Sequence, residues 1–158
     1  MEIDDYLLKV EQNLMVGAGR WVAEFNESFR SFPVGNHTFD LYVRGGTRPK
    51  GFLLSRLFAY FSLPSYNVAF FAKHVPRDDF NLGELRKAVE GRAAKRNIRW
   101  TWLVLIRSGS FPGELVRRVD GFDKPELGIS LVNLADWDVD TSSNILGRRA
   151  LSMVRIFK

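Results

Sequence analysis

Seven residues near the middle of the chain, Trp100 to Ile106 (WTWLVLI), form an almost continuously apolar run. A short run of this kind is typical of a β-strand buried on both faces, which occurs where helices cover both sides of a sheet. Residues 81–96 before it and residues 111–119 after it both favour helices. Strands that alternate with helices are joined by crossover connections, so the sequence predicts an α/β sheet with parallel members.

The remaining elements follow from hydrophobic periodicity and from turn residues. Residues 3–16 and a segment from about Ser143 onward favour helices, and further strands are expected at residues 21–30, 38–43, 67–74 and 127–134. The first three strands follow one another closely and predict a meander. The expected fold is a mixed five-stranded α/β sheet, covered on both faces, in the order α-β-β-β-α-β-α-β-α. No repeat or linker divides the chain, which predicts one domain over residues 1–158.

Composition excludes several classes of protein. The chain of 158 residues has no cysteine and two histidines, which excludes a disulfide scaffold and disfavours a zinc centre. No apolar run reaches the roughly 18 residues that a membrane span needs, and the acidic N-terminus is unlike a signal peptide. We therefore expect a soluble cytoplasmic protein without a membrane partner.

The net charge of +5 is unevenly distributed. Between Asp40 and Asp78 there is no acidic residue, and between Glu90 and Glu114 there is again none. The first stretch carries Arg44, Arg48, Lys50, Arg56, Lys73 and Arg77, and the second carries Arg92, Lys95, Arg96, Arg99 and Arg107. Such stretches favour a positive face that attracts phosphates, although a solvated surface explains them as well.

Two charged residues occupy informative places in this order. Asp40 lies on the second expected strand, and Lys73 lies on the third within the triplet Phe71-Ala72-Lys73. Over nearly the whole chain, the element order resembles the core of the restriction-endonuclease-like (PD-(D/E)xK) nuclease superfamily. In that superfamily the second strand supplies an Asp and the third a carboxylate–x–Lys triplet. The carboxylates hold Mg²⁺ or Mn²⁺ beside the scissile phosphate, and the lysine helps to position or activate water.

The resemblance implies that Asp40 is a metal ligand and that Asp40 and Lys73 are catalytic. Phe71 stands where the triplet has its acid, so a metal ligand is missing at that position. Glu84, on the helix after the third strand, is the residue that we expect to replace it as a second ligand and catalytic group. Glu90 on the same helix, Glu11 on the first helix and Glu24 on the first strand are further candidates.

Each of these residues also has a structural explanation. Asp40 can point at solvent opposite the core-facing Phe39 and Leu41. Lys73 can be a solvated lysine that protects a strand end, and Glu84 can be a carboxylate favoured in the first turns of a helix. His74, beside Lys73, can contact a phosphate or can be structural.

Two functions follow from these observations. The first is a protein that binds or processes DNA or RNA, with the phosphate-facing residues Arg44, Arg48, Lys50, His74 and Arg77 around Asp40 and Lys73. If it is an enzyme, it is a Mg²⁺- or Mn²⁺-dependent endonuclease; otherwise it needs no cofactor. The second is a non-catalytic interaction module that dimerises through residues 52–63, which are apolar on nearly every side and favour a buried helix or a subunit contact.

Overall fold

The structure is a computed structural model that describes residues 1–17, 19, 22–47 and 66–157. The expected segment at residues 52–63 therefore lies outside the described residues. The helices are α1 (Ile3–Val16), α3 (Leu82–Lys95), α4 (Gly113–Asp120) and α5 (Ile145–Val154). The strands are β1 (Glu24–Val34), β2 (His37–Gly46), β3 (Asn67–His74), β4 (Ile98–Arg107), β5 (Leu127–Asn133) and β6 (Asp138–Thr141). No described helix is long and apolar enough to cross a membrane.

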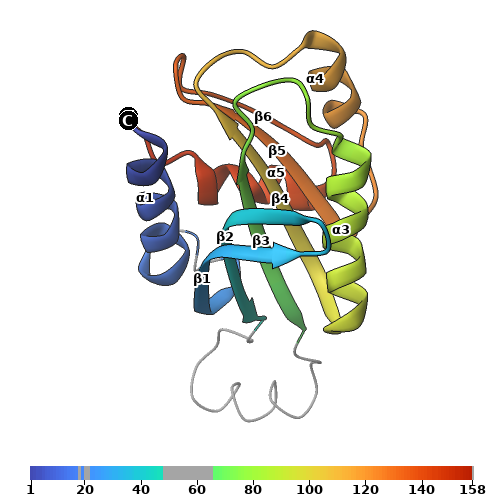
Figure 1. The fold of residues 1–158 in the computed structure, drawn as a ribbon. Coiled ribbons are helices and arrows are strands. Elements are labelled where there is room, and N and C mark those ends of the chain that lie inside the picture. Colours follow the sequence, from blue (N-terminus) through green and yellow to red (C-terminus); the bar gives the residue numbers. More distant parts are fainter. Residues whose placement is uncertain (18, 20–21, 48–65, 158) are drawn as a thin grey trace.

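All six strands belong to one mixed sheet in the order β1-β2-β3-β4-β5-β6 (Figure 1). β1, β2 and β3 pair antiparallel, β3, β4 and β5 pair parallel, and β6 pairs antiparallel with β5. The predicted mixed α/β sheet with a meander and parallel members is thus confirmed. The predicted count of five strands is wrong, because β6 was missed. That strand is a short sheet edge with the sequence Asp-Val-Asp-Thr, and charged, short edges lack the apolar alternation that marks a strand.

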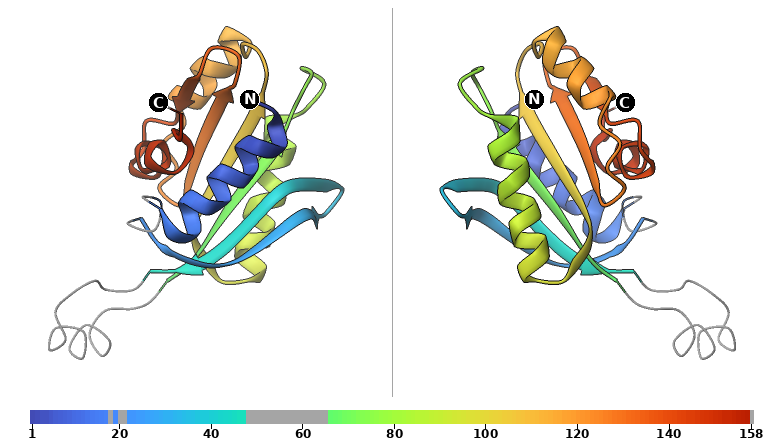
Figure 2. Two further views of the ribbon diagram at one scale, coloured as in Figure 1. Left: turned by 90° about the vertical axis from the view of Figure 1, so that its left-hand side faces the viewer. Right: turned by 90° about the vertical axis from the view of Figure 1, so that its right-hand side faces the viewer.

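Helices cover both faces of the sheet (Figure 2). α1 and α5 lie on one face, where the rings and methyl groups of Leu41, Phe70 and Trp102 pack beneath them. α3 and α4 lie on the other face, over a second core that includes Phe39, Phe71 and Leu103. Adjacent side chains of the central strands alternate between these two cores, which explains why β4 is apolar along almost its whole length.

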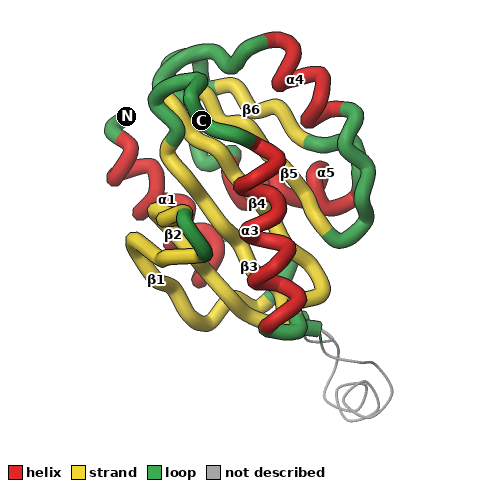
Figure 3. The backbone as a smooth tube through the Cα atoms, turned by 45° about the vertical axis from the view of Figure 1, so that its right-hand side comes forward, coloured by secondary structure: helices red, strands yellow, loops and turns green. Residues whose placement is uncertain are grey.

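α3 links the two ends of the sheet (Figure 3). It follows β3, and its first turn is capped by Asn81, whose side-chain oxygen accepts a hydrogen bond from the Glu84 N–H at 3.1 Å. It then runs back along the sheet to Lys95. Asn97 adopts a left-handed conformation with φ of 52°, a conformation that asparagine tolerates, and the chain turns there into β4. The C-terminal end of α3 is thereby placed beside the start of β4.

The β1–β2 hairpin does not keep a single alternation along its length. A register shift between Phe25 and Glu27 moves the following side chains to the opposite face, so Phe25 packs in the α1–α5 core while Phe29 contacts Tyr42 on the α3 side. Ser31 then adopts a positive φ of 49° and breaks the alternation again. The alternation of apolar and polar residues along β1 is interrupted once in the sequence, and the register shift is the structural reason.

Candidate functional site

Asp40 lies where β2 separates from β3. Pairing of the two strands ends at Leu41 and Ala72, and one Asp40 carboxylate oxygen (Oδ2) accepts a hydrogen bond from the backbone N–H of His74 at 2.7 Å. The next N–H along, that of Val75, points to β4 and donates to the Ile106 carbonyl. Neighbouring N–H groups of a strand point to opposite sides, so the His74 N–H points toward β2. The Asp40 carboxylate accepts the bond that the β2 backbone no longer provides.

Lys73 lies at the same end of the two strands as Asp40. Its ammonium donates to the Thr38 backbone oxygen at 2.6 Å and lies 5.9 Å from the centre of the Phe39 ring. The side chains of Asp40 and Lys73 thus each contact the neighbouring strand, but no ion pair joins these two side chains. The structure brings Asp40 and Lys73 to one place in the fold, and their polar contacts hold the strands together.

The position of the missing acid is part of the core. Phe71 is 0% exposed, and its ring stacks on Tyr42 at 4.7 Å between centroids and meets Phe39 edge-on at 5.2 Å. A buried aromatic residue therefore occupies the place where the resemblance expects a metal-binding carboxylate.

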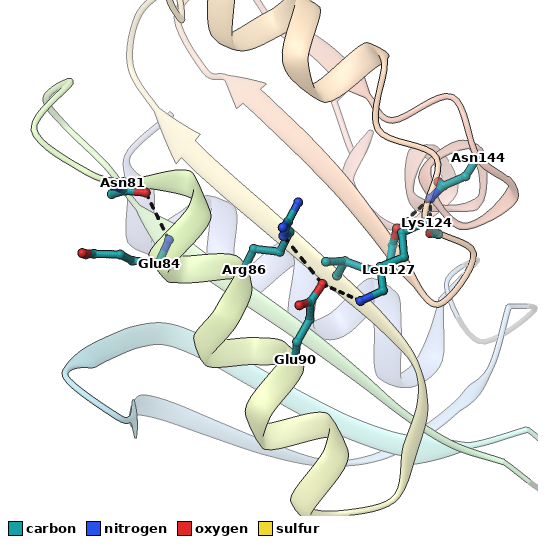
Figure 4. Close-up of polar contacts among 7 residues, drawn as sticks. All are labelled: Asn81, Glu84, Arg86, Glu90, Lys124, Leu127 and Asn144. Atoms are coloured by element: carbon teal, nitrogen blue, oxygen red, sulfur yellow. Dashed lines mark hydrogen bonds and ion pairs between the residues drawn. The ribbon is translucent and has the colours of Figure 1, made fainter.

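Glu84 does not supply the missing ligand in this arrangement. Its side chain is exposed in the first turn of α3, and Figure 4 shows it pointing away from the Arg86–Glu90–Lys124 group. Among the described residues no group of three or more potential ligands is gathered closely enough to hold a metal ion. The side chains around Asp40 thus do not fit a magnesium or manganese centre.

The other candidate carboxylates have different partners. Glu11 accepts hydrogen bonds from Ser28 and, at 2.6 Å, from Arg30, and so ties α1 to β1. Partial burial of Glu11 acts to raise its pKa, but the two hydrogen bonds outweigh it and lower the pKa of this carboxyl below its ordinary value. Glu90 pairs with Lys124 at 3.1 Å and with Arg86 at 3.6 Å, as Figure 4 shows. Glu24 is exposed at the start of β1.

The described residues expected to contact phosphates lie on β2, at the end of β3 and in the loop after β3. Arg44 on β2 pairs with Glu27 and lies over the Phe29 ring, while His74 ends β3 and Arg77 is exposed in the loop that follows. Arg48 and Lys50 lie outside the described residues. Of the described members of this group, His74 contacts Asp40 through its backbone N–H, whereas Arg44 is held by Glu27.

Loss of the Asp40 carboxylate is expected to destabilise the fold. In Asp40→Ala the His74 N–H loses its charged acceptor, and we expect the free energy of unfolding to fall by about 1.5–3 kcal/mol. Asp40→Asn retains an oxygen acceptor and should lose clearly less. Urea denaturation of the two variants and the wild type measures both values. Equal stability of Asp40→Ala and wild type would show that the bond to His74 contributes nothing.

A different group of cations gathers at the opposite end of the sheet. Four residues within eight positions, Arg92, Lys95, Arg96 and Arg99, lie along the end of α3 and the start of β4. Lys95, Arg96 and Arg99 are exposed, and no carboxylate in the described part of the chain pairs with any of the four. We call these four residues the α3 basic cluster. They come from the second acid-free stretch of the sequence.

A bulge in the sheet directs one member of this cluster. Asn67 pairs with Ile98, but the next residue, Val68, pairs with Trp100, so Arg99 is an extra residue in β4. Its guanidinium lies over the Tyr66 ring at 5.4 Å, and that ring contacts Trp100 at 5.7 Å. Sequence patterns could not locate Arg99 this way, because a bulge leaves no signal in an apolar run.

A groove of about 580 Å³ opens beside the α3 basic cluster. It lies between the C-terminal half of α3 and the segment that enters β5, over the starting ends of the parallel strands. Its charged lining residues are Arg99, Lys124, Glu90 and Glu126, and Asn67 and Asn97 also line it. The Glu90 charge is offset by Arg86 and Lys124. The groove thus presents the Arg99 cation and the polar side chains of Asn67 and Asn97, together with one exposed carboxylate, Glu126.

Comparison of the chain with protein-family models, with curated proteins and with solved structures found no significant match.

Proposed function

We propose that this protein binds nucleic acid and that the α3 basic cluster, with the adjoining groove, contacts the phosphate backbone. The observation that carries the proposal is the gathering of Arg92, Lys95, Arg96 and Arg99 without a single paired carboxylate among the described residues. Four cations within eight residues, with no paired carboxylate among the described residues, make this end of α3 positive and favour a polyanionic ligand. Phosphate contacts of this kind provide affinity and orientation without reading sequence.

The chemistry of the groove supports the same ligand. The side-chain amides of Asn67 and Asn97 are donors of the type that phosphate and sugar oxygens accept, and one Asn67 N–H already donates to the Asn97 backbone oxygen at 3.3 Å. Lys124, which is paired with Glu90, adds a further N–H donor on the β5 side of the groove (Figure 4). A backbone that crosses the end of α3 would thus meet donors on both walls of the groove.

The α-βββ-α-β order at the start of the chain supports a restriction-endonuclease-like core as the underlying fold. A metal-dependent endonuclease is the second candidate function, and the placement of Asp40 and Lys73 at one end of β2 and β3 is the observation in its favour. Because Phe71 is buried and Glu84 points elsewhere, binding without hydrolysis is the function that the geometry supports best. Dimerisation through residues 52–63 stays a prediction, since that segment lies outside the described residues.

Neutralising the α3 basic cluster is expected to weaken binding to every sequence alike. For each phosphate that the protein no longer neutralises, the slope of log K against log salt should fall by about 0.9 for duplex DNA and about 0.7 for single strands. We therefore expect Lys95→Gln with Arg96→Gln to lower affinity for random 20-mers and to flatten the salt dependence. Fluorescence anisotropy at a series of KCl concentrations measures both quantities.

The matched control is Arg117→Gln with Arg118→Gln. These two exposed arginines of α4 lie at the other end of the sheet and remove the same charge. Equal losses in the two double variants would mean that only net charge matters and would overturn the assignment of the face. Incubation of wild type and Asp40→Asn, the variant that retains the His74 acceptor, with plasmid and single strands in Mn²⁺ or EDTA separates binding from hydrolysis. Cleavage that requires both Mn²⁺ and Asp40 would establish the endonuclease instead.

A further inference from the structure

A ladder of aromatic rings runs from the core beneath α3 to the surface of the β1–β2 hairpin. The centroid distances are 5.2 Å for Phe39 and Phe71, 4.7 Å for Phe71 and Tyr42, 4.4 Å for Tyr42 and Phe32, and 5.8 Å for Tyr42 and Phe29. The inner three rings are fully buried, whereas Phe32 is partly exposed and Phe29 is 36% exposed. We call the two outer rings, Phe29 and Phe32, the aromatic ledge. Its rings are held in place by the stacked rings below them.

Two arginines lie over the rings of the aromatic ledge, so a stacked base would displace a guanidinium group or lie beside it. The Arg44 guanidinium lies 5.4 Å from the centre of the Phe29 ring, and that of Arg92 lies 5.0 Å from the centre of the Phe32 ring. Arg44 is paired with Glu27. Arg92 has no carboxylate partner in the described ranges, and its Nε atom is buried without a hydrogen-bond acceptor there. No described carboxylate therefore neutralises the Arg92 charge, and this cation lies against the aromatic ledge.

The ledge is continuous with the proposed phosphate-binding face. Arg92 belongs to the α3 basic cluster, and Lys95, three residues further along α3, projects from the same side of the helix. A strand whose phosphates contact Arg92 and Lys95 has its bases within reach of the β1–β2 hairpin. The aromatic ledge and the α3 basic cluster thus adjoin each other within this chain, through Arg92.

We propose that the aromatic ledge stacks the bases of single-stranded nucleic acid while the α3 basic cluster holds its phosphates. This inference rests on the proposed function and adds its substrate class. Unpaired bases expose their faces and stack on aromatic side chains, which single-strand-binding proteins combine with a positive groove. Paired bases in a duplex are already stacked on one another and offer only their edges and phosphates. The ledge would therefore contribute to binding of single strands and not of duplexes.

The test compares three probes that share negative charge and differ in their bases. A fluorescent 20-mer of thymidine, a 20-base-pair duplex and heparin are titrated with the wild type, Phe29→Leu and Phe29→Tyr, after melting curves have confirmed that each variant is folded. Leucine removes the stacking face, whereas tyrosine retains it. Trp137→Leu is the matched control, because Trp137 is 40% exposed and contacts Phe157, which packs against the core on the opposite face of the sheet.

Phe29→Leu is expected to weaken binding of the single strand by about 5- to 100-fold and to leave the duplex, heparin and the salt slope unchanged. Phe29→Tyr and Trp137→Leu should bind all three probes as the wild type does. An unchanged affinity of Phe29→Leu for the single strand, or an equal loss on the duplex, would overturn the ledge alone. Wild-type protein that binds none of the three probes would overturn the proposed function as well.

Discussion

Replacement of Phe71 by glutamate is expected to unfold the protein. The same substitution would create the carboxylate–x–Lys triplet of the nuclease superfamily that the element order resembles. Loss of a fully buried phenylalanine ring costs about 3–5 kcal/mol even when alanine takes its place. Burial of a carboxyl group between the Phe39 and Tyr42 rings adds several kcal/mol more. Together these losses approach the roughly 5–15 kcal/mol by which domains are stable.

Circular dichroism and two-dimensional amide NMR spectra of Phe71→Glu at 25 °C would measure this outcome. Phe71→Leu keeps an apolar side chain at the same site and should stay folded with a moderate loss of stability. Phe29→Glu makes the identical substitution on the partly exposed ring of the ladder and should cost about 1 kcal/mol. A cooperative melt of Phe71→Glu within a few degrees of the wild type would show that position 71 tolerates a carboxylate.

Position 71 is where this chain differs from the nuclease superfamily that its element order resembles. The aromatic ladder and a carboxylate–x–Lys triplet make opposite demands on position 71, since one needs a dry, stacked ring and the other a hydrated, charged oxygen. The ladder also supports the aromatic ledge at its outer end. In this protein, Phe71, which stands where the resemblance expects a metal-binding carboxylate, also lies beneath the proposed base-stacking surface.

The sequence predicted the central elements well, for physical reasons. β3 begins and ends at the expected residues, Asn67 and His74, and β4 and β5 differ from their expected ranges by no more than two residues at either end. These strands are buried on both faces, so their composition alone distinguishes them from helices and loops. The basic end of α3 was also visible, as a stretch without acidic residues. Long-range packing plays little part in either signal.

Features that depend on three-dimensional contacts were not predictable in the same way. The strand-bridging bond of Asp40 arises because two strands separate at that point, which no local pattern records. The aromatic ledge exists because a register shift after Phe25 and the left-handed Ser31 turn two rings toward α3. A one-residue shift changes the face of every following side chain, and its position is set by the partner strand.

Insertion of a single methyl group at Gly147 is expected to destabilise the protein by roughly 3 kcal/mol, at the upper end of the range for overpacking. Gly147 is buried in the first turn of α5, where a Cβ atom would overlap the Ser142 carbonyl and hydroxyl oxygens. The Ser142 hydroxyl accepts from Ile129 N at 3.0 Å and donates to Asn144 Oδ1 at 2.9 Å. Because Asn144 Oδ1 also caps Gly147 N at 2.8 Å, the methyl group would displace the junction of β5 and α5.

A glycine-to-alanine substitution is expected to have the opposite effect on the free energy of unfolding elsewhere in the chain. Gly91 lies inside α3, and a Cβ atom there would meet nothing within 4 Å. Gly91→Ala should therefore raise the free energy of unfolding by about 0.5–1 kcal/mol, because alanine restricts the unfolded chain and favours the helix. Urea denaturation of Gly147→Ala and Gly91→Ala side by side measures both. A Gly147→Ala variant as stable as Gly91→Ala would mean that α5 can move away from β5 at no cost, contrary to the close contact between them.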